Sequence, residues 1–128
     1  MKITFTKMHG IGNDFIILNQ LENQYNLNSE LIRSLSHRQF GIGFDQLLII
    51  ESSLNPKAEF KYRIFNADGN EVEQCGNGAR CFYRYIKNKN LSKNSKITVE
   101  TKSGLIVLSE HSENLISVDM GKPIFKDK

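Results

Sequence analysis

The chain has 128 residues, of which 39% are hydrophobic and 24% are charged. These values indicate one domain with a hydrophobic core and exclude a disordered chain, and no apolar run is long enough for a membrane span. The formal net charge of +3 comes from scattered lysines, without an arginine-rich stripe and interleaved aromatic residues, so neither a nucleic acid nor a membrane is expected as a partner.

The first third of the chain predicts two strands and a helix. Residues 2–7 alternate between apolar and polar side chains, which is typical of a strand and not of a signal peptide, so a cytoplasmic protein is expected. A glycine-punctuated loop over residues 8–15 leads into the apolar run 14–19, which predicts a buried strand. A helix should then begin near the capping residue Asn28 and stop at Gly41.

The rest of the chain predicts five strands and a second helix. Residues 45–51 and 59–65 are strand-like, and the turn-rich segment 66–74 predicts a loop. A helix of about three turns is expected over residues 76–88. Three further strands are expected, over residues 96–101, 104–110 and 114–120. The order β-β-α-β-β-α-β-β-β predicts an α+β domain with mostly antiparallel pairing.

The helix predicted over residues 76–88 has one apolar face and a cysteine before its first turn. The apolar positions, at i, i+3, i+4 and i+7, should pack on a sheet; they are Ala79, Phe82, Tyr83 and Ile86. Cys75 stands where unpaired N–H groups and the helix dipole bind anions and stabilise a thiolate, an effect that Glu71 and Glu73 oppose if they lie near. From the residues alone, Cys75 is an inert thiol, a proton-transfer group or a nucleophile paired with a distant histidine.

Cys81 should have a different role from Cys75. Six helical residues span about 9 Å, whereas a disulfide needs Cα atoms within about 7 Å, so the two thiols cannot bridge along one helix. We therefore expect Cys81 to be a small buried core residue. The two cysteines and three dispersed histidines lack the spacing of metal ligands, so no metal is expected.

Three stretches together resemble one known family: residues 7–15 (KMHGIGNDF), 41–50 (GIGFDQLLII) and 63–82 (RIFNADGNEVEQCGNGARCF). They are similar to the N-terminal half of diaminopimelate epimerase, a cofactor-independent amino-acid epimerase. The resemblance implies an α+β fold in which a mostly antiparallel sheet wraps around a central helix, as one half of a two-domain, pseudo-twofold molecule. Residues 1–116 would be this half-domain, and residues 117–128 would connect it to a second half.

The resemblance also implies a reaction, a substrate and a set of site residues. The family interconverts LL- and meso-diaminopimelate, in lysine and peptidoglycan-precursor synthesis, through two cysteine thiols on opposite faces of the α-carbon. By position, Cys75 matches one acid/base thiol, and Gly76 and Asn77 match groups that hold the carboxylate and amino end. Further substrate contacts would come from three amides, Asn13, Gln46 and Asn66. Amides suit a zwitterion because they donate and accept hydrogen bonds without adding charge; without the resemblance, Asn13 and Asn66 would be interpreted as turn residues and Gln46 as a polar strand end.

Members of the family are longer by a second, similar half, which carries the second thiol. The chain alone is therefore expected to be inactive, because Cys81 cannot replace that thiol. In a variation of this hypothesis, two copies associate through the face that the second half covers, giving a homodimer. The alternatives are a non-catalytic carboxylate-binding module and another isomerase of the same fold, similar to proline racemase or to a phenazine-biosynthesis protein.

Overall fold

The structure, a computed structural model, describes residues 5–9, 12–21, 27–39, 41–73, 77–102, 104–112 and 115–119. Within these ranges the strands are β1 (Phe5–His9), β2 (Asp14–Asn19), β3 (Gln46–Glu51), β4 (Phe60–Asn66), β5 (Glu71–Val72), β6 (Lys96–Thr101), β7 (Gly104–Ser112) and β8 (Leu115–Asp119). The helices are α1 (Ser29–Ser36) and α2 (Asn77–Asn88). The predicted α+β class is confirmed.

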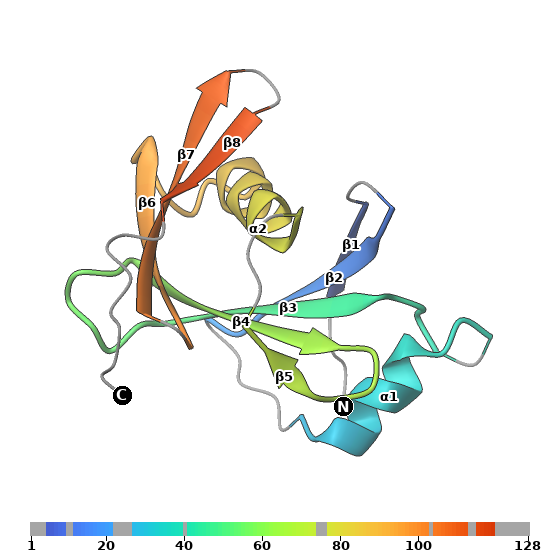
Figure 1. Ribbon diagram of the computed structural model, residues 1–128. Coiled ribbons are helices and arrows are strands. Elements are labelled where there is room, and N and C mark those ends of the chain that lie inside the picture. The colour runs from blue at the N-terminus through green and yellow to red at the C-terminus, as the bar shows by residue number, and fades with distance from the viewer. Residues whose placement is uncertain are drawn as a thin grey trace, which may run out of the picture.

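The described strands form one curved sheet in the order β1-β2-β3-β4-β6-β7-β8, and the short β5 pairs with β4. Neighbouring strands run antiparallel, except that β2 is parallel to β3 and β4 is parallel to β6. Figure 1 shows the sheet curving around α2, with β6, β7 and β8 on one side, β1 to β4 on the other, and α1 outside the curve. The prediction of a mostly antiparallel sheet around a central helix is confirmed.

The directions of the strands explain why the two helices lie on opposite faces of the sheet. α1 connects the parallel pair β2–β3, and α2 lies in the connection between the parallel pair β4–β6. β2 and β4 run in opposite directions, since β3 is parallel to one and antiparallel to the other. Both connections step the same way along the strand order. Right-handed crossovers from strands of opposite direction must place their helices on opposite faces.

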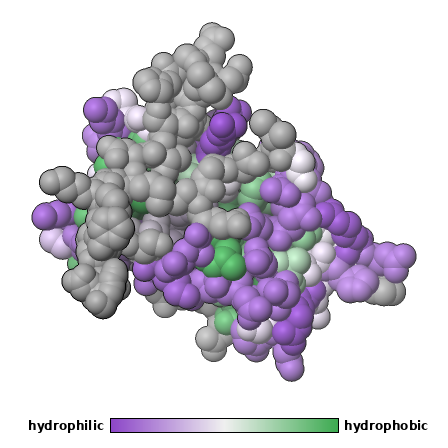
Figure 2. All heavy atoms as spheres, viewed as in Figure 1, coloured by the Kyte–Doolittle hydropathy of each residue, from purple (hydrophilic) through white to green (hydrophobic). Residues whose placement is uncertain are grey.

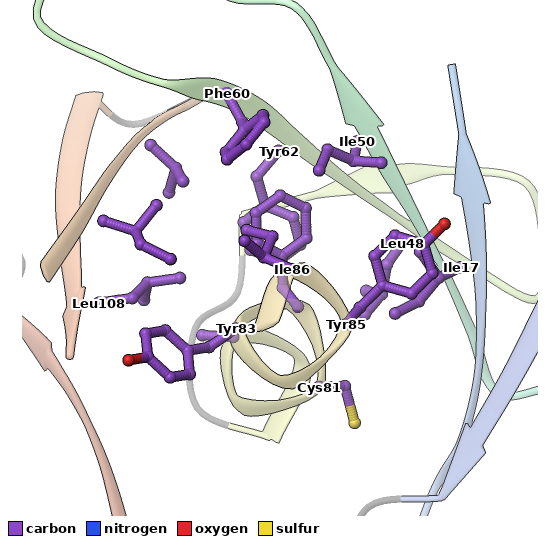
Figure 3. Close-up of a cluster of buried hydrophobic side chains, with 14 of the residues drawn as sticks. Ile17, Leu48, Ile50, Phe60, Tyr62, Cys81, Tyr83, Tyr85, Ile86 and Leu108 are labelled. Carbon is purple, nitrogen blue, oxygen red and sulfur yellow. The ribbon is translucent and has the colours of Figure 1, made fainter. Parts of the chain in front are cut away.

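The larger hydrophobic core lies between the sheet and α2. The sheet contributes every second residue of three central strands: Phe15 and Ile17, Leu48 and Ile50, and Phe60, Tyr62 and Ile64. The predicted apolar face of α2 meets them, and none of its four residues is more than 2% exposed. The rings of Tyr62 and Phe82 have their centroids 4.3 Å apart, and Figure 3 shows Tyr62 and Ile86 together between α2 and β4. Each such side chain contributes about 1.5–3 kcal/mol when fully buried, so this interface fixes the position of α2.

A second, smaller core lies on the α1 face. It consists of buried side chains from β2, β3, α1 and the segment before β3: Ile16, Leu18, Leu47, Ile49, Ile32 and Phe44. β2 and β3 are therefore covered on both faces, which explains why their sequences are continuous apolar runs and not alternating patterns. The predictions of buried strands at residues 14–19 and 45–51 are confirmed to within one residue.

Two predicted loops are shorter than expected. Met8 and His9 belong to β1, where they pair with Phe15 and Asp14, so the strand continues through part of the predicted 8–15 loop. The predicted 66–74 loop contains β5, which pairs with the end of β4. A tight turn allows this pairing: Gly69 has φ +92 and donates its N–H to the Asn66 oxygen at 2.9 Å. In both places, hydrogen bonding to a neighbouring strand makes residues extended although their sequence is rich in turn formers.

The predicted end of α1 at Gly41 is wrong, because the helix ends at Ser36. The chain leaves the helix at His37 with extended backbone angles and then turns back along the last turn. Gly41 donates its N–H to the His37 oxygen at 2.8 Å, and a Cβ at this position would lie 2.3 Å from the Ser34 oxygen. Gly41 is thus required for close packing beside the helix end and not as its cap.

Candidate functional site

Two of the predicted substrate-contacting amides meet at one end of the sheet. Gln46 begins β3 and Asn66 ends β4, and the antiparallel register places them directly opposite each other. The Gln46 Nε2 group donates a hydrogen bond to Asn66 Oδ1 at 3.0 Å. Both side chains are half-buried. This contact orients both amide groups, because the carboxamide of Gln46 donates and that of Asn66 accepts.

Asn13 lies at the same end of the sheet. It immediately precedes β2, and its neighbour Asp14 exchanges two hydrogen bonds with Asp45, the residue before Gln46. Asp14 donates its N–H to Asp45 Oδ2 at 2.7 Å, and Asp45 donates its N–H to the Asp14 oxygen at 2.9 Å. The starts of β2 and β3 are thereby joined, so the structure brings the backbone of Asn13 close to the Gln46–Asn66 pair.

The Gln46–Asn66 pair belongs to the α2 face of the sheet. Gln46 has the same strand parity as Leu48, and Asn66 the same parity as Ile64, and both of these residues contact the core around α2. Leu48 and Ile64 are the next pair along this face, and a Cβ at Gly78, in the first turn of α2, would lie 3.5 Å from Leu48 Cδ2 and 3.8 Å from Ile64 Cδ1. The first turn of α2 therefore lies beside the amide pair.

Gly78, in the first turn of α2, packs against the sheet. A Cβ at this position would lie 2.6 Å from the Tyr62 hydroxyl oxygen and 3.5 Å from Leu48 Cδ2. The missing side chain thus lets the helix approach β3 and β4 closely. Because of this approach, the N-terminal end of α2 is held close to β3 and β4.

Cys75 and Gly76 lie outside the described residues, as does the side chain of Asn77. α2 begins at Asn77, two positions after Cys75 in sequence, and its first turn contains no acidic residue. The unpaired N–H groups and the positive dipole end of α2 favour an anion at this point. The roles of Cys75, Gly76 and Asn77 stay predictions.

Glu71, which would oppose a thiolate at Cys75 if it lay near, is paired with Arg63. Arg63 donates to both carboxylate oxygens of Glu71, from Nε at 3.1 Å and from Nη2 at 2.9 Å. These hydrogen bonds lower the pKa of Glu71 from its ordinary value. The charge of Glu71 is thus balanced locally by Arg63, on β4.

Cys81 is a buried core residue, as predicted. It is 4% exposed, in the second turn of α2, and it belongs to the larger core. Burial raises the pKa of the Cys81 thiol. A neutral thiol in this position acts as a small apolar side chain.

The described part of the chain holds no group of three or more histidine, cysteine, aspartate or glutamate side chains that could bind a metal ion. Among the helices described, none has the length and hydropathy to cross a membrane.

A groove of about 1120 Å³ lies on the opposite face of the sheet from the amides. Ile32 of α1, Ile49 and Phe65 line it together with charged residues such as Lys61 and Glu100. Because these residues face away from α2, the groove is separate from the amide site. In the view of Figure 2, the described surface is mainly hydrophilic, with only small separate hydrophobic areas.

Solved structures of several isomerases and racemases resemble this fold. A methylitaconate-delta-isomerase matches with a TM-score of 0.69 and 18% identity, over 89% of this chain and 35% of that one. A probable proline racemase from Agrobacterium radiobacter K84 matches with a TM-score of 0.66 and 15% identity, over 84% of this chain and 37% of that one. The chain thus has the fold of one part of these larger isomerase and racemase structures.

Sequence comparison identifies the family within this class. The family model of diaminopimelate epimerase matches residues 5–126, so the chain belongs to the diaminopimelate epimerase family. The diaminopimelate epimerase of Psychrobacter sp. (strain PRwf-1) is 53% identical over 126 residues, which are 98% of this chain and 43% of the relative. That of Aromatoleum aromaticum is 49% identical over 126 residues and 46% of its own length. The chain therefore spans less than half the length of these curated relatives.

Proposed function

We propose that residues 1–128 form the half of a diaminopimelate epimerase site that carries one of two acid/base thiols, Cys75. The observation that supports this most directly is the Gln46–Asn66 hydrogen bond beside the first turn of α2. Membership of the family supplies the reaction class, and the position of the amides supplies a place for the substrate. In this proposal, the activity belongs to lysine and peptidoglycan-precursor synthesis, in the cytoplasm.

The reaction needs stabilisation of negative charge that develops on the substrate carboxylate. The α-proton of an amino acid is very weakly acidic, so the site must lower the energy of the carbanion-like transition state. In this proposal the free N–H groups at the start of α2, at Gly76 and Asn77, bind the carboxylate. The side chains of Asn13, Gln46 and Asn66 hold the rest of the amino-acid end, and Cys75 removes or returns the α-proton.

The second thiol must come from outside these 128 residues. The only other cysteine in the sequence is Cys81, which is buried in the core on the second turn of α2. A thiol held there, with a raised pKa, does not reach a substrate at the helix start. Inversion requires one thiol on each face of the α-carbon, so the chain alone should not invert diaminopimelate.

The experiment is a chimera in which this chain replaces the 126 matching residues of the Psychrobacter relative. We expect the chimera to interconvert LL- and meso-diaminopimelate and the 128-residue chain alone to produce no inversion, with circular dichroism confirming that both are folded. Inversion by the chain alone would overturn the proposed half-site. A folded chimera that inverts proline and leaves diaminopimelate unchanged would favour a racemase function instead.

A further inference from the structure

We propose that Arg38 is a positioning residue that fixes the places of the three substrate-contacting amides. The inference rests on the proposed function, because it gives Arg38 a role toward the side chains that would bind diaminopimelate. Arg38 lies after α1, and the chain carries it to the end of the sheet where β2 and β3 begin.

Arg38 bridges two carboxylates. Its Nη1 group donates to Asp14 Oδ2 and its Nη2 group donates to Asp45 Oδ1, each at 3.0 Å. The remaining oxygens of both carboxylates are also engaged, since Asp14 Oδ1 lies 2.6 Å from His9 Nδ1 and Asp45 Oδ2 accepts from the Asp14 N–H. The guanidinium thus closes a network that joins β1, β2, the segment after α1 and the start of β3.

Each substrate-contacting amide is next in sequence to a residue held by this network. Asn13 precedes Asp14, and Gln46 follows Asp45. Asn66, the last residue of β4, is directly followed by Ala67. Ala67 donates its N–H to the backbone oxygen of Asp45 at 3.1 Å. A shift of Asp14 would therefore move Asn13, and a shift of Asp45 would move Gln46, because a single peptide bond joins each pair.

The backbone at Gly43 lies close to the stem of Arg38. Gly43 has φ +83, and a Cβ there would lie 3.3 Å from both the Cα and the Cγ of Arg38, so the absent side chain lets the two segments pack closely. The Arg38 side chain is 56% exposed, and exposed ion pairs contribute little to stability. Loss of Arg38 should consequently alter the site geometry more than the stability of the fold.

The test uses the ¹⁵N-labelled 128-residue chain and follows the side-chain NH₂ signals of Asn13, Gln46 and Asn66 by NMR, with and without meso-diaminopimelate. Arg38→Gln removes the bridge, and Arg38→Lys restores contact with one carboxylate at a time. Arg33→Gln is the matched control, because the described contact of Arg33 is to the Asp68 backbone oxygen at 3.4 Å and not to either carboxylate. Thermal unfolding of each variant shows whether the fold is intact.

We expect Arg38→Gln to move the NH₂ signals of Asn13 and Gln46 in the free chain and to raise the Kd for meso-diaminopimelate about tenfold, the size expected for a misplaced hydrogen bond to a charged group. Arg38→Lys should recover part of both effects, and Arg33→Gln should change neither. Unchanged signals and Kd in Arg38→Gln, or equal changes in Arg33→Gln, would overturn the inference.

The same titration separates this inference from the proposed function. If meso-diaminopimelate leaves the amide signals of the unmodified chain unmoved at millimolar concentration, the proposed substrate is wrong. The signals of the free chain then still decide the role of Arg38, because they report the amide positions without a ligand.

Discussion

Gln46 and Asn66 become one site through the register of β3 and β4, although 20 residues separate them in sequence. Their candidacy was predictable from the motifs in which they occur, but their contact was not, because register depends on which strands pair. Arg38 was missed for a related reason. Its partners Asp14 and Asp45 lie 24 and 7 residues away, and local spacing carries no signal for a network of that kind.

Cys81 illustrates what residue spacing does predict. Helical spacing separated Cys81 from Cys75, and the tendency of free cysteines to be buried predicted a core position, which the structure confirms. A 3.6-residue period determines which face of a helix a residue occupies, whatever the rest of the fold does. The placement of Cys75 itself stays a prediction.

Gly78 provides a test of the close contact between α2 and the sheet. Gly78→Ala should destabilise the fold by about 1–3 kcal/mol, because the clash with the buried Tyr62 hydroxyl outweighs the better helix propensity of alanine. In a Tyr62→Phe background the same substitution should lose most of its cost, since the nearest remaining atom would be Leu48 Cδ2 at 3.5 Å. Urea unfolding of the four proteins measures this, and an equal cost in both backgrounds would contradict the proposed contact.

At the scale of the elements, the middles of helices and strands were predicted better than their ends. Continuous apolar runs correctly predicted β2 and β3, and periodicity correctly predicted α2. The end of β1 and the presence of β5 depend on pairing with other strands, and the end of α1 depends on packing with the segment that follows it. The Gly41 backbone, for example, packs against the helix end instead of capping it.

The start of α1 follows from a local signal that the sequence does show. Asn28 Oδ1 accepts a hydrogen bond from the Leu31 N–H at 2.8 Å and so caps the helix. Asn28→Ala should lower the free energy of unfolding by about 1 kcal/mol, whereas Asn28→Asp should keep most of the cap. Equilibrium unfolding in urea measures the difference, and equal stability of the alanine and aspartate variants would exclude this cap.

At the scale of the whole molecule, the α+β class was predictable and the strand order was not. The order of elements along the chain indicated mostly antiparallel pairing, but β4 pairs in parallel with β6 only because α2 crosses over one face of the sheet. The division of the chain at residue 116 stays a prediction. The position of the amide site, between the start of α2 and one end of the sheet, is a product of this topology.

The ion pairs on the sheet should make the stability of the molecule depend on pH in a defined direction. Arg63 lowers the pKa of Glu71, so Glu71 is ionised more readily in the folded state than in the unfolded state. The ionised Glu71 therefore stabilises the folded state. This stabilisation is complete above the ordinary carboxyl pKa of about 4 and is lost as the pH falls through the lower, folded-state pKa. Arg63→Met should thus be less stable than the unmodified chain at pH 6, with a smaller difference at pH 3.

Urea midpoints at the two pH values measure this change, with Arg33→Met as a control for the loss of an exposed arginine. A difference between Arg63→Met and the unmodified chain that stays constant from pH 6 to pH 3 would show that the Arg63–Glu71 pair does not contribute in this way.

The central claim is that Cys75 is one of two acid/base thiols that act on diaminopimelate. Its most direct test is the incorporation of solvent deuterium at the α-carbon of diaminopimelate by the chimera with the Psychrobacter half. The account predicts exchange of both epimers by the unmodified chimera, a loss of about 100-fold or more for one of the two epimers in Cys75→Ala, and little change in Cys81→Ala. Equal exchange by the Cys75→Ala and unmodified chimeras, from both the LL- and the meso-epimer, would contradict it.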